Sequence, residues 1–253
     1  MDLKIETRSN PLSIKRLIII PAYNEEKQIA SVIKGIRKYS DAEIVVIDDG
    51  SKDRTADSAG SAGARVIRHP FNMGAGVAVQ TGYKYAFENG CETLLQIDGD
   101  GQHHPSHIPD MFAMVENRRC DMAIGSRFLK NSEYKTGLLK LMAIKLFRGV
   151  IRMITGETIT DPTSGYRCMN RTIFRYFTED GFPHDYPDAN IIIVLHRMGF
   201  KMAELPVMMQ PNPEGRSMHR GIFKISHYFF KVFMSIFITL LRKKSSLLGG
   251  EQL

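Results

Sequence analysis

The chain has 253 residues, of which 43% are hydrophobic and 24% charged, a composition typical of a globular protein with a substantial core. Its three cysteines lack metal-ligand spacing and their number is odd, which argues against a zinc site or a disulfide framework and favours a reduced compartment. The formal charge of +7 favours an anionic partner, such as nucleic acid, a phosphorylated metabolite or a membrane surface.

Apolar runs that are typical of buried strands alternate with stretches of helical spacing. The expected strands are Leu17–Ile20, Ile44–Ile47, Arg65–Arg68, Thr93–Ile97 and Met122–Ile124. Helices are expected over residues 29–36, from Asp53, within Asn72–Gly90 and from Pro105 to about Asn117. Asn24 is expected to cap the first helix, with Glu25 and Glu26 in its first turn. This alternation predicts an α/β fold, with a mostly parallel central sheet and helices on both faces.

Polar motifs follow four of the expected strands at the point where each strand ends. They are P-A-Y-N-E-E from Pro21, D-D-G-S from Asp48, D-G-D-G-Q-H from Asp98 and G-S-R from Gly125. Ligands of open α/β sheets bind beyond the carboxyl ends of the strands, so these motifs predict one shared site. The first turn lacks G-x-G-x-x-G and the glycine-rich segment 72–76 lacks the P-loop lysine, which argues against a NAD enzyme and a P-loop.

Asp98 and Asp100 are the strongest candidates for a metal site. Side chains two residues apart on an extended chain face the same side, and two close carboxylates repel each other unless a cation or a shared proton lies between them. Gln102 adds a neutral oxygen, and a few hard oxygen ligands suit Mg²⁺ or Mn²⁺ held together with substrate phosphates. Ordinary turn chemistry and an aspartyl phosphatase with Asp98 as nucleophile are the alternatives, and His103 is a weaker candidate ligand.

Six motifs in order give the chain a resemblance to the inverting family-two glycosyltransferases. They are P-A-Y-N-E-E, D-D-G-S-K-D-R-T, N-M-G-A-G, D-G-D-G-Q-H, G-S-R and D-P-T-S-G-Y-R, between about Arg16 and Pro206. The branch that it most resembles is the dolichol-phosphate mannose synthase type, which transfers a sugar from a nucleotide diphosphate to a polyprenyl phosphate. The resemblance implies the GT-A nucleotide-sugar-binding fold over residues 16–210, between an N-terminal extension (1–15) and a C-terminal segment (211–253).

The resemblance also implies a site for a UDP- or GDP-linked sugar. The residues implied around the nucleotide are Pro21, Tyr23, Glu25, Asp48, Asp49 and Asp98. Among them Asp49 is the likelier contact to the base, because a carboxylate accepts from base N–H groups. Asp98, Asp100 and Gln102 are implied to hold Mg²⁺ or Mn²⁺ and, through it, the diphosphate, with the metal neutralising charge on the leaving group.

On the acceptor side, the resemblance implies Arg127 and the motif from Asp161 to Arg167. A lipid phosphate is already an anion near pH 7, so it needs orientation and charge neutralisation more than a general base. The candidate contacts to that phosphate are Arg127, Ser164, Lys145 and Arg216. Lys145 stands where this branch tends to carry Arg, whose planar fork suits phosphate better. Asp161 is interpreted as a base, an orienting group or a structural residue, and the expected catalytic set is Asp100, Asp161 and Arg127.

Residues 222–241 carry apolar side chains at helical spacing, interrupted by Lys224, His227 and Lys231. A spanning helix needs about 20 apolar residues, and a lysine near its centre costs about 2.5–3.5 kcal/mol. An amphipathic helix on an anionic membrane surface is therefore expected, and packing on protein is the alternative. The first ten residues are too charged for a signal peptide. We expect a peripheral protein on the cytoplasmic face of the cell membrane, with a small membrane protein as a further partner and no nucleic acid.

Two other functions stay open. The first is a transferase of the same fold with a sugar-hydroxyl acceptor in cell-surface polysaccharide synthesis, which would depend on a base such as Asp161. The second is the phosphatase, which needs Thr or Val after D-G-D-G, where Gln102 stands. The base and the sugar of the donor are not determined by these motifs.

Overall fold

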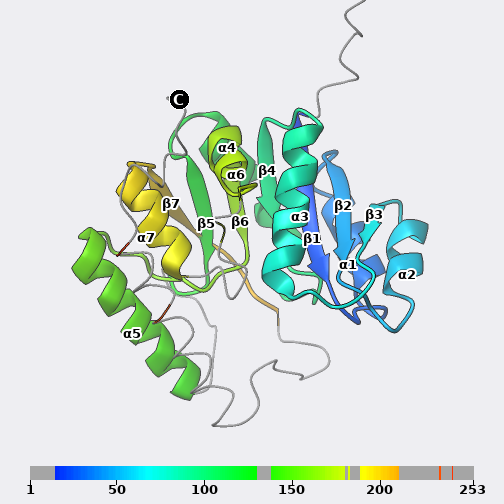
Figure 1. Ribbon diagram of the computed structural model, residues 1–253, viewed down its shortest axis with the longest axis horizontal. Helices are drawn as coiled ribbons and strands as arrows, with labels where there is room; N and C mark the ends of the chain where they lie inside the picture. Colours follow the sequence, from blue (N-terminus) through cyan, green and yellow to red (C-terminus); the bar gives the residue numbers. More distant parts are fainter. Residues whose placement is uncertain are drawn as a thin grey trace, which may run out of the picture.

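The molecule is built on one seven-stranded sheet, in the order β3-β2-β1-β4-β6-β5-β7 (Figure 1). The computed structural model describes residues 15–129, 138–179, 182, 189–210, 234 and 241. The strands are β1 (Arg16–Ala22), β2 (Glu43–Asp48), β3 (Arg65–Arg68), β4 (Thr93–Gln96), β5 (Met122–Ser126), β6 (Arg167–Asn170) and β7 (Met202–Pro206). All the neighbouring strands are parallel except that β6 runs antiparallel to β4 and β5. The expected mostly parallel sheet is confirmed.

Helices cover both faces of this sheet, each over its own apolar core. The helices are α1 (Ile29–Arg37), α2 (Thr55–Ser61), α3 (Ala75–Glu88), α4 (Ile108–Glu116), α5 (Leu138–Thr155), α6 (Arg171–Tyr176) and α7 (Ala189–Met198). A 3₁₀ turn, η1 (Pro105–His107), precedes α4. Buried side chains of α1, α2 and α4 pack on one face, and those of α3, α5, α6 and α7 on the other. Because alternate residues of a strand point to opposite faces, the continuous apolar runs supply both cores.

The antiparallel strand β6 was not predicted, because its four residues carry a charge and no apolar run. Its direction has a consequence for the site. Arg167, the first residue of β6, lies in register with Gln96 near the end of β4 and with Ile124 in β5. An antiparallel strand begins where its parallel neighbours end, so the motif that precedes β6 lies at the same edge as the other polar motifs.

The first helix begins later than expected. α1 begins at Ile29 with Gln28 before it, and its first turn contains no acidic residue. Asn24 instead adopts a left-handed conformation with φ of 57°, and its Oδ1 accepts a hydrogen bond from the N–H of Lys52 at 2.9 Å. The prediction that Asn24 caps the helix is therefore wrong. Its side chain joins two loops at the sheet edge, which a reading of local helix signals does not detect.

No helix among the described residues is long and apolar enough to cross a membrane. The expected C-terminal amphipathic helix lies outside the described residues, apart from Met234 and Leu241, both of which are helical. The three cysteines, Cys91, Cys120 and Cys168, are buried and free, as expected for small core residues.

Candidate active site

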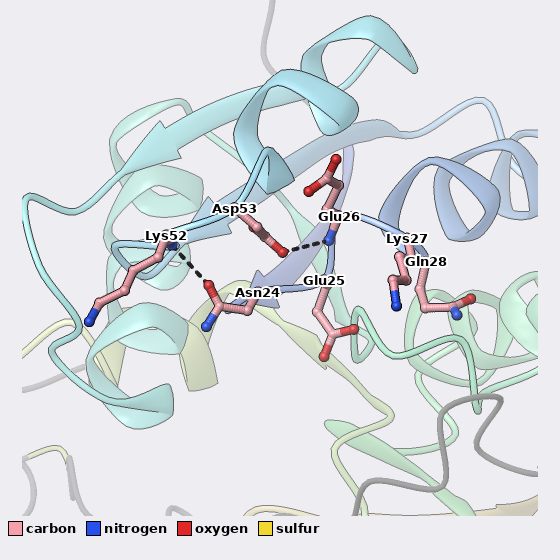
Figure 2. A pocket seen from close by; sticks show the side chains of 7 residues that line it. All are labelled: Asn24, Glu25, Glu26, Lys27, Gln28, Lys52 and Asp53. Atoms are coloured by element: carbon pink, nitrogen blue, oxygen red, sulfur yellow. Dashed lines mark hydrogen bonds between the residues drawn. The ribbon is translucent and has the colours of Figure 1, made fainter.

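The first two motifs form one wall of the site because their loops are bonded to each other. The N–H of Asn24 donates to Ser51 Oγ at 2.9 Å, and the N–H of Glu25 donates to Thr55 Oγ1 at 2.8 Å. Between these loops lies a pocket of about 360 Å³, lined by residues 24–28 with Lys52 and Asp53 (Figure 2). Tyr23 beside it has 41% of its surface exposed. Of the predicted nucleoside residues, Glu25 therefore lines the pocket and Tyr23 is exposed at this edge, while Pro21, in β1, is half-buried.

Asp48 and Asp49, at the end of β2, are buried and held by donors of the protein. Asp49 accepts hydrogen bonds from the N–H groups of Met73 and Gly74 at 2.9 and 2.8 Å, and its Oδ1 lies 2.8 Å from His69 Nδ1. Asp48 accepts from the N–H of Ser51 at 3.0 Å and forms an ion pair with Arg68 at 3.1 Å. Asp49, predicted as the likelier base contact, thus uses both oxygens to fix the N-M-G-A-G loop.

Asp98 and Asp100 lie beyond the end of β4 and keep more exposure to solvent. The Asp98 side chain is 41% exposed, and its Oδ2 lies 3.2 Å from His103 Nε2. Asp100 Oδ1 accepts a hydrogen bond from the N–H of Gln102 at 3.0 Å. The packing around Asp98 raises its pKa, but the hydrogen bond from His103 and the positive charges of Arg127 and Arg167 outweigh that effect, so the pKa lies below its ordinary value. The Asp98 carboxylate therefore stays ionised at neutral pH.

The donor set of this motif fits a hard divalent cation that keeps part of its coordination for a ligand. Two carboxylates and one amide oxygen are available along five residues of chain, and Mg²⁺ and Mn²⁺ accept such oxygen ligands together with phosphate. Within the described residues there is no group of three His, Cys, Asp or Glu side chains placed to hold a metal. A closed metal site made of such side chains is therefore not found in the part of the chain that the structure describes.

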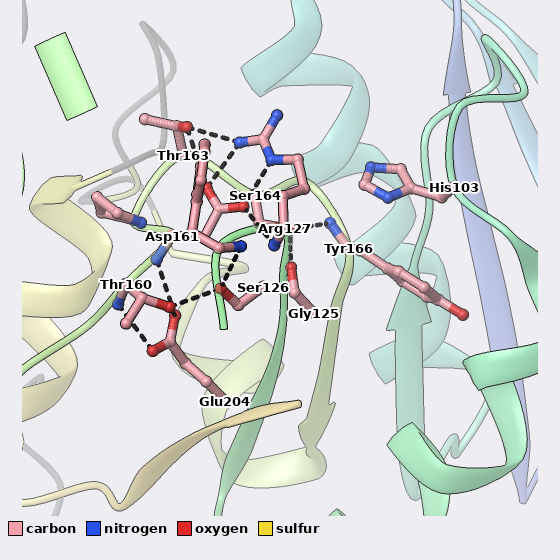
Figure 3. Close-up of polar contacts among 12 residues, drawn as sticks. His103, Gly125, Ser126, Arg127, Thr160, Asp161, Thr163, Ser164, Tyr166 and Glu204 are labelled. Carbon is pink, nitrogen blue, oxygen red and sulfur yellow. Dashed lines mark hydrogen bonds and ion pairs between the residues drawn. The ribbon is translucent and has the colours of Figure 1, made fainter. Parts of the chain in front are cut away.

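Arg127 and Asp161 form a buried, two-pronged ion pair (Figure 3). Arg127 Nε and Nη2 donate to the two oxygens of Asp161 at 2.6 and 2.7 Å, and the backbone N–H of Arg127 donates to Oδ2 at 3.0 Å. Arg127 Nη2 also donates to Thr163 Oγ1 at 2.8 Å. Asp161 is fully buried and engaged through both oxygens. Of the three roles considered for Asp161, these contacts favour the structural one.

The remaining predicted acceptor residues lie in different environments. Ser164 is buried, and its hydroxyl donates to the carbonyl oxygen of Gly125 at 2.6 Å. Lys145 is exposed on α5. Arg216 lies outside the described residues. Ser164 therefore ties its own motif to G-S-R, while Lys145 is available to a ligand.

Two residues that the sequence analysis did not single out complete this side of the site. Glu204, on β7, accepts hydrogen bonds from the N–H groups of Thr160 and Asp161 at 2.7 and 2.8 Å, and burial raises its pKa. Arg148, on α5, donates to the carbonyl oxygen of Thr160 at 2.6 Å and lies over the ring of Phe128. Arg148 stands three residues after Lys145, so helical spacing could have suggested it. Glu204 carries no local signal, since its partners are more than 40 residues away.

Comparison with known proteins places these motifs in a family. The profile of Glycosyl transferase family 2 matches residues 17–177. An uncharacterized protein of Methanocaldococcus jannaschii is 33% identical over 192 residues, which cover 75% of this chain and 79% of that protein. The UDP-N-acetylglucosamine–dolichyl-phosphate N-acetylglucosaminyltransferase of Methanococcus voltae is 28% identical, with 75% and 83% covered. The undecaprenyl-phosphate mannosyltransferase of Micrococcus luteus is 26% identical, with 81% and 87% covered.

Solved structures share the fold at lower identity. Glucosyl-3-phosphoglycerate synthase from Mycobacterium tuberculosis, in complex with Mn²⁺, UDP and glucosyl-3-phosphoglycerate, superposes with a TM-score of 0.66 at 20% identity, covering 89% of this chain and 79% of that one. The same enzyme with Mn²⁺ and UDP-glucose also gives a TM-score of 0.66, at 21% identity, covering 89% and 78%. The expected GT-A fold is confirmed by this likeness.

Proposed function

The chain belongs to glycosyl transferase family 2 and is a glycosyltransferase, and from that membership we propose that it transfers a hexose from a nucleotide diphosphate to a polyprenyl phosphate. Two relatives are named for transfer to dolichyl or undecaprenyl phosphate, and each matches over three quarters or more of this chain. The observation that carries the proposal is the position of Asp98 and Asp100 after β4, which lies in the sheet with β1 and β2, whose loops line the pocket, on one side and β5, which leads to Arg127, on the other. The proposed places of the sugar donor and of the phosphate acceptor are therefore adjacent.

On the donor side, we place the nucleoside against the loops after β1 and β2. Pro21, Tyr23 and Glu25 line it, and Asp48 and Asp49 hold the loops behind it. Asp98, Asp100 and Gln102 would hold Mg²⁺ or Mn²⁺ with the diphosphate. The metal would neutralise the negative charge that develops on the departing nucleoside diphosphate. The Mn²⁺ and UDP-sugar in the solved structures of similar fold support this choice of cofactor.

In the proposed reaction, an oxygen of the acceptor phosphate attacks the anomeric carbon from the face opposite the diphosphate. The new carbon–oxygen bond forms as the bond to the diphosphate breaks, so the anomeric configuration inverts. Because the phosphate is already an anion, no general base is needed. The engagement of Asp161 with Arg127 agrees with this, since a buried carboxylate with both oxygens bonded is poorly placed to take a proton.

The acceptor phosphate is proposed to lie near α5, which carries Lys145 and Arg148. The same helix supports peripheral contact with the membrane, because its outer face exposes Met142, Leu146 and Met153, the last with 86% of its surface exposed. Arg152 is also exposed there and would face anionic headgroups. α5 lies at the outer edge of the molecule beside α7 (Figure 1). The cytoplasmic face, a small membrane-protein partner and the domain limits stay predictions.

The proposal is tested by following radiolabel from UDP- and GDP-sugars into solvent-extractable lipid in membranes supplied with polyprenyl phosphate. Asp100→Asn is expected to lower the rate at least 100-fold, with Mn²⁺ or Mg²⁺ required. Asp57→Asn is the matched control, because Asp57 has a 70% exposed side chain on α2, and it is expected to leave the rate unchanged.

The alternatives give different outcomes in the same assay. Label in a water-soluble or insoluble glycan would indicate a sugar-hydroxyl acceptor. Release of inorganic phosphate through a covalent adduct on Asp98 would indicate the phosphatase. Lipid labelling that needs no divalent metal and survives Asp100→Asn would contradict the proposed metal–diphosphate site.

A further inference from the structure

Gly165, in the acceptor-side motif, is packed against the carboxylate of Asp98, 67 residues earlier in the chain. A Cβ atom at Gly165 would lie 2.6 and 2.7 Å from the two oxygens of Asp98 and 2.9 Å from its Cγ. Contacts this short are essentially never made by a Cβ atom, so a side chain at position 165 would displace the carboxylate. Glycine after Ser164 is common in turns, and the need to leave space for the Asp98 carboxylate is a second reason for a glycine at position 165.

His103 holds the same carboxylate from another side. Its Nε2 lies 3.2 Å from Asp98 Oδ2, and since an ionised carboxylate only accepts, Nε2 is the nitrogen that carries the hydrogen. The other ring nitrogen, Nδ1, is buried and has no hydrogen-bond partner among the described residues. A buried polar ring is costly unless its polar atoms are used. Among the described residues, the hydrogen bond to Asp98 is the one that the His103 ring makes.

The position of His103 is itself set by distant segments. Its ring packs on the ring of Tyr166, with 5.1 Å between centroids, and the two residues lie side by side in Figure 3. Its backbone forms an antiparallel bridge with Met209, and the next bond in that pairing joins the N–H of Gln210 to the carbonyl oxygen of Gln102 at 2.7 Å. Gly165 therefore contacts Asp98 directly. Its neighbour Tyr166 acts on Asp98 indirectly, because it packs on the ring of His103.

We propose that Gly165 and His103 are positioning residues for Asp98, which set the place of one carboxylate in the diphosphate–metal site. The inference rests on the proposed function. Gly165 leaves the space that the carboxylate occupies, and His103 restrains one of its oxygens. Metal sites depend on such outer contacts, whose removal typically weakens metal binding about 10–100-fold. The acceptor-side motif thereby shapes the donor side of the site.

Four variants test the proposal: Gly165→Ala, His103→Leu, His103→Gln and the control Gly60→Ala. A Cβ at Gly60, on α2, meets no atom within 4 Å. The measurement is the affinity for Mn²⁺ by calorimetry, in the presence of whichever of UDP or GDP the wild type binds more tightly, with thermal unfolding recorded for each variant. Nucleotide affinity is measured separately in EDTA.

We expect Gly165→Ala and His103→Leu to weaken Mn²⁺ binding about 10–100-fold, while nucleotide affinity in EDTA stays the same. The glutamine amide can replace the Nε2 donor, so His103→Gln should recover affinity to within about threefold of the wild type. Gly60→Ala should match the wild type. If Gly165→Ala does not fold, the comparison of His103→Leu with His103→Gln decides.

Wild-type Mn²⁺ affinity in folded Gly165→Ala, or equal losses in His103→Gln and His103→Leu, would overturn the positioning roles. Asp98→Asn separates this failure from failure of the proposed function. If Asp98→Asn abolishes Mn²⁺ binding while Gly165→Ala and His103→Leu bind normally, only the positioning inference fails. If Asp98→Asn also binds Mn²⁺ normally, Asp98 is no ligand, and the proposed metal site and the positioning inference fall together.

Discussion

Carboxylates at the same edge of the sheet differ in how the protein uses them. Asp49 and Asp161 are buried, and each is bonded through both oxygens to donors of the protein. The side chain of Asp98 is 41% exposed, and Asp100 is partly exposed. A buried ionised carboxylate must be fully paired, whereas a partly hydrated one can exchange water for a cation. We therefore call Asp49 and Asp161 frame carboxylates, and Asp98 and Asp100 the carboxylates proposed to bind the ligand.

Buried carboxylates also hold loops without regular structure in place. Asp49 fixes the loop before α3 through two backbone N–H groups, and Glu204 fixes the loop before β6 in the same manner. Charge-assisted hydrogen bonds to backbone N–H groups are among the stronger ones in proteins. Removing a frame carboxylate should therefore reduce stability, while removing a ligand carboxylate should reduce binding.

The largest effect is expected from Asp161→Ala, which leaves the buried guanidinium of Arg127 without its counter-charge. Breaking a buried pair on one side typically costs about 3–5 kcal/mol in the free energy of unfolding. Urea denaturation measures the loss. Asp98→Asn is the comparison, because its amide oxygen can still accept a hydrogen bond from His103 Nε2, and it should lower the free energy of unfolding by about 1 kcal/mol or less. Similar losses in the two variants would erase the distinction between frame and ligand carboxylates.

Asp49→Ala should follow, with a loss of about 2–3 kcal/mol, because the N–H groups of Met73 and Gly74 lose a charged acceptor. Hydrogen exchange should show faster exchange at these two amides than in the wild type. If the protection of both amides is unchanged, Asp49 does not hold the loop, and it returns as a candidate for the base contact.

Glu204→Gln is expected to lower the free energy of unfolding by about 1–3 kcal/mol. The amide has one accepting oxygen, while Thr160 and Asp161 each direct an N–H group at the side chain, so one donor loses its partner. The measurement is denaturation at neutral pH, with the exposed Glu157→Gln as control. A variant as stable as the wild type would place Glu204 outside the frame.

The smallest effect concerns pH and the segment that leads out of β7. Burial lowers the pKa of His107, whose Nε2 accepts the N–H of Met208 at 3.0 Å and is therefore unprotonated. A histidine with a lowered folded pKa contributes stability above its ordinary value of about 6.5, and this contribution is lost as the pH falls below that value. Between pH 7.5 and 5.5 the Tm should fall about 1–2 °C more in the wild type than in His107→Gln. Equal shifts would contradict this role for His107.

Much of the fold follows from local pattern. The strand at 65–68 was predicted with the bounds that the structure has, and Ile29, Val32, Ile33 and Ile36 are buried on α1 as their spacing requires. The family and the GT-A fold also followed from the order of the motifs. The cap predicted at Asn24 was wrong and the antiparallel β6 was missed, because both features depend on partners far along the chain.

The alternation of strands and helices, and the types of residue that meet at the sheet edge, follow from local pattern, since side-chain periodicity and turn chemistry act over a few residues. Tertiary contacts set which carboxylates are buried and paired and which stay partly exposed. Burial, hydrogen bonds and packing set that division. The hydrogen-bond partners of Asp161 and Asp49 include residues 34 and 25 positions away, and Asp98 packs against a residue 67 positions away. Distances of that kind along the chain leave no periodic pattern.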